Sequence, residues 1–202
     1  YHLKDSQIGY IYNPISVNDF NPATLSNTQI NFVAMRRLHK VKNYPLMLHA
    51  FKVVSEAYGD IRLSIAGSGP LENELKELVE QLNIKDKVEF LGNVRDVPNL
   101  LNKMDALLLS SVSEACPMAI LEAMASGLPV IATDVGGVSE LVSDNGIVVP
   151  SEDVEAFASA MTMIIESPTL LRNMGCKGRL YSSKYDKTNI AAEYGQEYIN
   201  LV

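Results

Sequence analysis

Short apolar runs alternate with helical patterns along most of the sequence. In the segment 44–58, four residues recur at steps of three and four, as on the buried face of an amphipathic helix: Met47, Phe51, Val54 and Tyr58. The run "ALLL" (106–109) is instead apolar at every position, which is typical of a parallel strand covered by helices on both faces. Such runs predict strands at 30–35, 61–67, 87–92, 105–110, 128–133 and 146–150. The helical patterns predict helices at 44–58, 70–82, 96–103, 117–126, 136–142 and 153–166, and two or three more in the tail, the last near 188–201.

This alternation predicts an α/β fold, a doubly wound parallel sheet of the Rossmann-like class. Residues 1–28 are rich in Asn, Pro and Ser, and they predict an extended N-terminal segment rather than a packed element. We therefore expect one Rossmann-like domain over 29–187, followed by a C-terminal helix in 188–202. Ligands of such sheets bind at the carboxyl ends of the strands, so the loops that follow the strands should hold the chemistry.

Composition narrows the function classes. The 202 residues carry a net charge of −7, which argues against nucleic acid or an anionic membrane as the partner. Two cysteines are too few for a disulfide framework and wrongly spaced for a metal site, which favours a reducing cytoplasm. No apolar run approaches the roughly 18 residues of a membrane span. The chain starts at "YHLKDSQ" without a Met, which indicates a piece of a longer protein.

The loop after the first predicted strand is strongly basic. It reads "RRLHKVKN" (36–43) and leads into a helix, for which Asn43 is the predicted N-cap. Cations are unfavourable before a helix N-terminus, and a bound phosphate would resolve that conflict. A solvated surface loop is the alternative, and spacing alone does not choose between the two.

Two glycine-containing loops follow other strands. "GSGP" (67–70) begins like a dinucleotide-binding fingerprint, but Glu72 stands where the third glycine belongs. A tight turn explains it equally well, and Gly67 and Gly69 remain candidates for close approach to a ligand. "TDVGGVSE" (133–140) offers a second such loop or a plain turn.

The segment "SEACPMAILEAMASGLPV" (113–130) holds the most informative pattern. Its helix is almost entirely apolar yet contains Glu122, and Glu114 lies eight residues earlier. An unpaired buried carboxylate is costly, so a polar group should be present to receive it. Pro117 suits the first helical position, and the N–H groups near Met118 and Ala119 lack an obvious side-chain acceptor. The alternative for Glu122 is a wet helix face or an ion pair with a core arginine.

From about residue 10 to the end, these segments resemble the C-terminal domain of the retaining GT-B glycosyltransferases of family four, or group 1. The main marker is the family's E-x7-E pattern, here Glu114 and Glu122. The family's G-R-L-x-x-x-K-G loop aligns with residues 36–43, and Arg37 and Lys42 take the places of its diphosphate-binding pair. Lys40 is a competing cation. Arg36 and Asn43 stand where the family pattern has glycines, and "EACP" replaces the usual E-G-F-G.

The resemblance implies a role for each matched residue. Glu122 would accept hydrogen bonds from the ribose, Glu114 would lie beside the donor sugar, and Arg37 and Lys42 would neutralise the leaving diphosphate. Amides near Met118 and Ala119 would meet the pyrophosphate or ribose. The loop 92–96 would contact the base through Val94 and Arg95.

The resemblance also implies a function. The chain would be the donor-binding half of a retaining, metal-independent glycosyltransferase. It would use a UDP- or GDP-linked hexose without a cofactor and act on a glycan, lipid or small-molecule acceptor. The acceptor would be held by a missing N-terminal domain of the same polypeptide, without which this half would be inactive. Without that domain, four residues of the last helix should be partly unburied: Ile190, Tyr194, Tyr198 and Leu201.

Two other functions remain open at this point. A non-catalytic nucleotide-binding regulatory module would have the same site. Loss of the phosphate-binding cations would favour this function, but both cations are present. A nicotinamide-dependent oxidoreductase is disfavoured by the broken glycine fingerprint.

Overall fold

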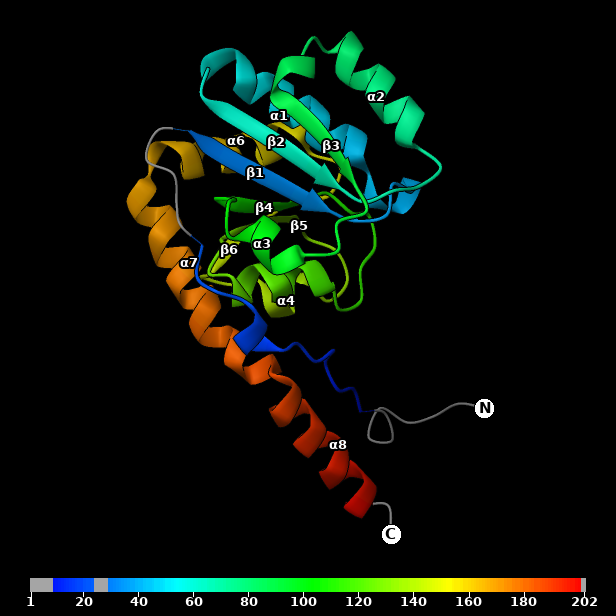
Figure 1. The fold of residues 1–202 in the computed structure, drawn as a ribbon, viewed down its shortest axis with the longest axis vertical. Coiled ribbons are helices and arrows are strands. Elements are labelled where there is room, and N and C mark those ends of the chain that lie inside the picture. Colours follow the sequence, from blue (N-terminus) through cyan, green and yellow to red (C-terminus); the bar gives the residue numbers. More distant parts are fainter. Residues whose placement is uncertain (1–8, 24–28, 201–202) are drawn as a thin grey trace.

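The computed structural model of the chain describes residues 9–23 and 29–200, in which six strands form a parallel sheet (Figure 1). The strands are β1 (Ile30–Met35), β2 (Ile61–Ala66), β3 (Val88–Gly92), β4 (Ala106–Leu109), β5 (Val130–Thr133) and β6 (Gly146–Val149). They lie in the order β3-β2-β1-β4-β5-β6. The strand order reverses between β1 and β4, which is the point where doubly wound sheets bind their ligands.

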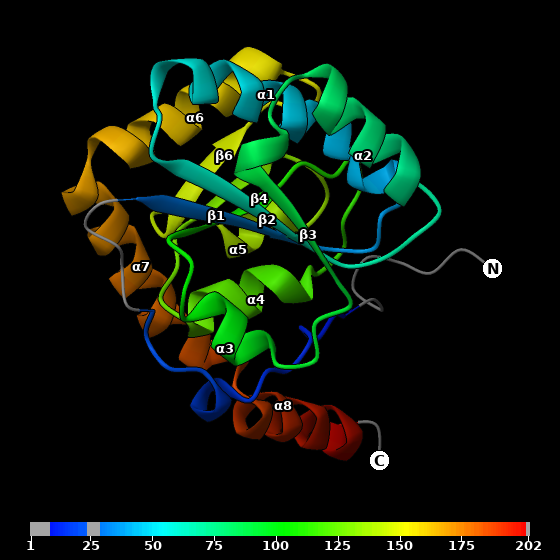
Figure 2. The same ribbon diagram turned by 45° about the horizontal axis from the view of Figure 1, so that its top comes forward.

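Helices cover both faces of the sheet. One face is covered by α1 (Tyr44–Ala57), α2 (Glu72–Gln81) and α6 (Val154–Glu166), as Figure 2 shows above the sheet. The other is covered by α3 (Val97–Leu101), α4 (Met118–Ala125) and α5 (Val138–Leu141). Helix α7 (Pro168–Ser182) packs against α4, and a 3-10 turn joins it to α8 (Lys187–Asn200). The predicted α/β doubly wound fold class is confirmed.

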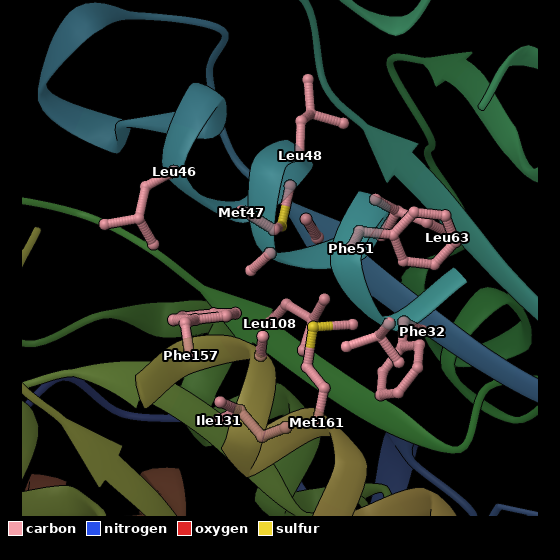
Figure 3. Packing of buried hydrophobic residues seen from close by; sticks show 14 of the residues in the cluster. Phe32, Leu46, Met47, Leu48, Phe51, Leu63, Leu108, Ile131, Phe157 and Met161 are labelled. Atoms are coloured by element: carbon pink, nitrogen blue, oxygen red, sulfur yellow. The ribbon is translucent and has the colours of Figure 1, made fainter. Parts of the chain in front are cut away.

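Alternation along the strands divides the core into two clusters. Phe32 of β1 and Leu108 of β4 point toward α1 and α6, where they meet Phe51 and Met161 (Figure 3). Val33, which follows Phe32 along β1, and Leu107 and Leu109, which flank Leu108 in β4, point to the other face and belong to the cluster under α4. The "ALLL" run is therefore buried on both faces because each face has its own helical layer.

The predicted bounds of these elements differ from the observed ones by at most two residues at either end. At the helix starts, the predicted N-cap position of Asn43 is confirmed, whereas the predicted position of Pro117 was wrong. Asn43 occupies the N-cap of α1, but its side chain makes no capping hydrogen bond, and its backbone is left-handed (φ 43°, ψ 47°). Pro117 is the N-cap of α4 rather than its first helical residue.

Over its described residues 9–23 the N-terminal segment has little regular structure and many exposed residues, but it is anchored to the domain, which the sequence did not predict; residues 1–8 and 24–28 lie outside the described part of the chain. The backbone N–H of Ile15 donates to the carbonyl oxygen of Tyr185 (2.8 Å), and the N–H of Lys187 donates to that of Ile15 (2.8 Å). Ile15 and Phe20 are both buried. This segment is therefore paired with the chain between α7 and α8.

Arg179 of α7 fastens the N-terminal segment to α4. Its Nη1 donates to the carbonyl oxygens of Val17 (3.1 Å), Phe20 (2.9 Å) and Ala125. Helices α7 and α4 approach closely enough that a Cβ on Gly175 would overlap the carbonyl oxygen of Gly127. Arg179 thus satisfies carbonyls of the segment and of the α4 C-terminus together.

Helix α8 projects away from the domain (Figure 1). Tyr194 and Tyr198 are 47% and 69% exposed, as expected, whereas Ile190 is 1% exposed and the expectation for it was wrong. Leu201 lies outside the described residues. None of the described helices is long and apolar enough to cross a membrane.

Replacing Arg179 by Met should lower the free energy of unfolding of the chain by about 2 kcal/mol, because partly buried carbonyl oxygens lose their donor. Urea denaturation followed by circular dichroism measures the change. The matched control is Lys177→Met on the same helix, where a half-exposed ion pair with Asp144 is lost. Equal effects of the two variants would contradict the role given to Arg179.

Candidate functional site

A crevice of about 540 Å³ opens at the carboxyl ends of β1, β2 and β3. Its walls come from the loops after these strands and from helices α3 and α4: residues 35–37, 66–69 and 93–94, with Val97 and Glu122. The crevice lies beside the reversal of strand order, where the sheet topology predicts a ligand site.

Glu114 is a buried carboxylate beside this crevice, and its side chain is 7% exposed. Its Oε1 accepts hydrogen bonds from Lys42 Nζ (2.8 Å) and Ser111 Oγ (2.7 Å), and Arg36 Nη2 lies 3.8 Å away. The carboxylate therefore joins the basic loop after β1 to the loop between β4 and α4.

Backbone contacts hold these two loops together. Ser110 Oγ donates to the carbonyl oxygen of Lys42 (3.0 Å), and the N–H of Val112 donates to that of Val41 (2.9 Å). Lys42 is consequently fixed at its backbone by one loop residue and at its side chain by Glu114.

Glu122 reaches the crevice from the otherwise buried helix α4. Burial raises the pKa of its carboxyl above the ordinary value, and the nearby positive charge of Arg36 opposes that shift without cancelling it. Glu122 is half-buried and faces the crevice, and Arg36, which lines the same crevice, is its electrostatic partner there rather than in the core.

Arg36 is the site residue that the sequence patterns did not single out. Its Nε and Nη2 atoms are buried and have no hydrogen-bond partner among the described residues. Its backbone is fixed, because its N–H donates to the carbonyl oxygen of Ala66 (3.0 Å) and its carbonyl accepts from Tyr44 Oη (3.0 Å). The two consecutive arginines directly after the first strand were the available signal, but the family pattern directs attention to Arg37.

Glycines bring the loops of the site together. A Cβ on Gly67 would overlap the carbonyl oxygen of Arg36, and one on Gly69 would overlap that of Leu38. A Cβ on Gly136 would likewise overlap the carbonyl oxygen of Glu114. Gly67 and Gly69 do line the crevice, but their closest approach is to a neighbouring loop.

The remaining predicted residues are spread around this centre. Arg37 is exposed and lines the crevice, as does the half-buried Val94, whereas Arg95 is exposed and is not among the lining residues. Met118 and Ala119 form the first turn of α4 outside the lining, and that turn has no side-chain cap. Within the described ranges, no group of three His, Cys, Asp or Glu side chains could hold a metal ion.

Residues 17–181 match the sequence family described as glycosyl transferases group 1. The chain belongs to this family. The match includes the crevice, both carboxylates and the basic loop, so the group 1 resemblance expected from the sequence is confirmed.

Two proteins similar to this chain are about twice as long. An uncharacterized glycosyltransferase of Haemophilus influenzae is 32% identical over 95% of this chain and 55% of its own length. The N-acetyl-alpha-D-glucosaminyl L-malate synthase of Bacillus anthracis is 32% identical over 88% of this chain and 47% of its own length. The chain therefore spans about half the length of these curated relatives.

A solved structure shows the same fold. The crystal structure of Anabaena Alr3699/HepE in complex with UDP superimposes with a TM-score of 0.88 at 20% identity, over 98% of this chain and 58% of that protein. A second structure of the same protein contains UDP-glucose and gives a TM-score of 0.87. The Rossmann-like fold is thus that of a GT-B glycosyltransferase domain.

Replacing Glu122 by Gln should stabilise the fold at neutral pH. Because the folded-state pKa of Glu122 is raised, its contribution to stability is fully present below about pH 4.5 and is lost as the pH rises through the folded-state value. Gln removes that loss. The variant should match the unaltered chain in acid and have the higher free energy of unfolding at pH 7.

Urea denaturation at a series of pH values measures this difference. Glu77→Gln, on the exposed face of α2, is the matched control and should show little pH-dependent gain. A Glu122→Gln variant that is less stable at pH 7 would instead make Glu122 a structural ion-pair partner.

Proposed function

We propose that this chain is the donor-binding domain of a retaining, metal-independent hexosyltransferase. In this proposal the crevice binds a nucleoside-diphosphate sugar. The main support is that Glu114 and Glu122 lie at one strand edge with Arg36, Arg37 and Lys42 around them. Such a site offers acceptors for sugar hydroxyls and donors for phosphate in and directly beside the crevice.

In this proposal each residue contacts a different part of the donor. Glu122 accepts hydrogen bonds from the ribose hydroxyls, and Val94 and Arg95 lie nearest the base. Glu114, already oriented by Lys42 and Ser111, positions the hexose. The amides of Met118 and Ala119, at the uncapped start of α4, are assigned to the pyrophosphate or the ribose.

Arg37 and Lys42 are assigned the electrostatic part of the reaction. As the bond from the sugar to the diphosphate breaks, negative charge grows on the leaving phosphate, and fixed cations stabilise it. This is work that a divalent ion does in other enzymes. The proposal therefore includes neither a metal nor a cofactor.

The acceptor would be held by another domain. The chain spans about half the length of its curated relatives, which supports a separate acceptor-binding part. The exposed side chains of Tyr194 and Tyr198 on α8 offer a surface against which such a domain could pack. A glycan, a lipid or a small molecule would all suit this arrangement.

Nucleotide binding tests the proposal directly. Titration calorimetry with UDP, GDP and ADP in excess EDTA should show binding of at least one diphosphate, and excess Mg²⁺ should not change its affinity. Glu122→Gln should weaken that affinity about tenfold, because hydrogen bonds to a charged acceptor are lost. Glu77→Gln should leave it unchanged. A strict Mg²⁺ requirement, or no binding by a folded chain, would refute the site assignment.

The chain alone should bind donor without transferring sugar. Holding donor and acceptor in reacting geometry can contribute roughly 7–11 kcal/mol to lowering a barrier, and this domain supplies only the donor side. The assay follows release of the nucleoside diphosphate from UDP-glucose or GDP-mannose with a mixture of acceptors. Robust turnover by these residues alone would contradict the half-enzyme assignment; nucleotide binding with no transfer even in the longer protein would favour a regulatory module.

A further inference from the structure

Arg36 lies beside Glu114 and lines the same crevice as Glu122, and the proposed function assigns its side chain to no particular part of the donor. The residue follows β1 directly, and its side chain is 17% exposed. Its Nη2 is 3.8 Å from Glu114 Oε1, and its charge also acts on Glu122. The positive charge of the Arg36 guanidinium thus acts on both Glu114 and Glu122, the two ends of the segment 114–122.

Neither carboxylate satisfies the hydrogen-bond donors of Arg36. A separation of 3.8 Å is too long for a hydrogen bond, so the contact with Glu114 is one of charge only. The Nε and Nη2 atoms are both buried, and neither donates to any of the described residues. Unused donors on a buried charged group are costly. These two atoms form one edge of the guanidinium fork, which matches the spacing of two phosphate oxygens.

Contacts with neighbouring residues hold the backbone of Arg36 in place. The N–H of Arg36 is bonded to Ala66, its carbonyl is bonded to Tyr44, and Gly67 packs against that carbonyl. The backbone of Arg36 does not have a positive φ; among the described non-glycine residues, only Asn43, Asn83 and Glu152 do. The backbone therefore accepts an arginine without strain where the family pattern has glycine.

We propose that Arg36 binds the diphosphate of the donor through its Nε and Nη2 atoms. The inference rests on the proposed function, in which Glu122 binds the ribose and Glu114 lies beside the sugar. In a nucleoside-diphosphate sugar the diphosphate connects these two units, so a cation beside Glu114 in the crevice that Glu122 lines faces it. Arg36 then acts from a partly buried position, whereas Arg37 acts from an exposed one.

A comparison of nucleosides with nucleoside diphosphates tests this role. The unaltered chain, Arg36→Met and Arg36→Lys are titrated with UDP, GDP and ADP and with the corresponding nucleosides. Arg36→Met keeps an unbranched apolar stem but removes the charge, and it should weaken diphosphate binding about tenfold to a hundredfold. Nucleoside binding should change less than about twofold. Arg36→Lys keeps the charge without the fork, and its diphosphate affinity should also fall below that of the unaltered chain.

Arg62→Met is the matched control. Arg62 is an exposed arginine at the start of β2, at the opposite end of the strands, and its replacement should leave both affinities unchanged. Circular dichroism checks that each variant is folded. Should Arg36→Met be unfolded, Arg36→Lys and competition by inorganic pyrophosphate for the bound nucleotide carry the test.

The outcomes separate this inference from the proposed function. Failure of every diphosphate to bind the folded, unaltered chain would refute the proposed function itself. Diphosphate binding that Arg36→Met and Arg36→Lys leave intact would overturn only the assignment of Arg36. An equal loss of nucleoside and diphosphate affinity would also overturn it, because Arg36 would then act only as a spacer between Glu114 and Glu122.

Discussion

The buried carboxylate of Glu114 is the interaction on which the site depends. The basic loop after β1 brings several cations to one strand edge, and they need a counter-charge when the loop is packed against its neighbours. Glu114 supplies it from the next strand in the sheet by accepting from Lys42 and lying 3.8 Å from Arg36. The two loops can meet only because β4 pairs with β1, that is, because the strand order reverses there.

The spacing between loops is set by glycines that need not touch a ligand. A side chain at Gly67 would displace the backbone of Arg36, and one at Gly136 would displace that of Glu114. Arg36 and Glu114 are thus each backed by a glycine from the next loop along the sheet. This explains the glycine-containing loops without a dinucleotide fingerprint: close packing of loop on loop requires the missing Cβ as much as close approach to a phosphate does.

The sequence contained most of the fold, because apolar periodicity reports directly on which faces are buried. The sequence also contained the E-x7-E pattern of Glu114 and Glu122, because a spacing of eight residues can be read without knowing where the loop and the helix lie. Side-chain direction in a loop has no such period. Arg36 and Arg37 are adjacent and chemically identical, and only the course of the chain after Met35 decides which guanidinium lies beside Glu114.

Two other residues show where local patterns are insufficient. Asn43 stands at a helix start, where an N-cap is expected, yet the position requires a left-handed backbone, which Asn tolerates better than most residues. Ile190 shares a helical face with Tyr194 and Tyr198, but pairing of Ile15 with Tyr185 and Lys187 holds the first turn of α8 against the domain. The face is therefore buried at one end and exposed at the other. Long-range pairing of this kind leaves no periodic trace in the sequence.

Helix α4 is fixed in the core by Arg179 and by the close crossing at Gly175. This packing holds Glu122 at the crevice even though burial raises the pKa of its carboxyl. If Glu122 does bind a ribose, the loss of stability caused by its ionisation is the cost of presenting a charged acceptor from a helix that cannot move.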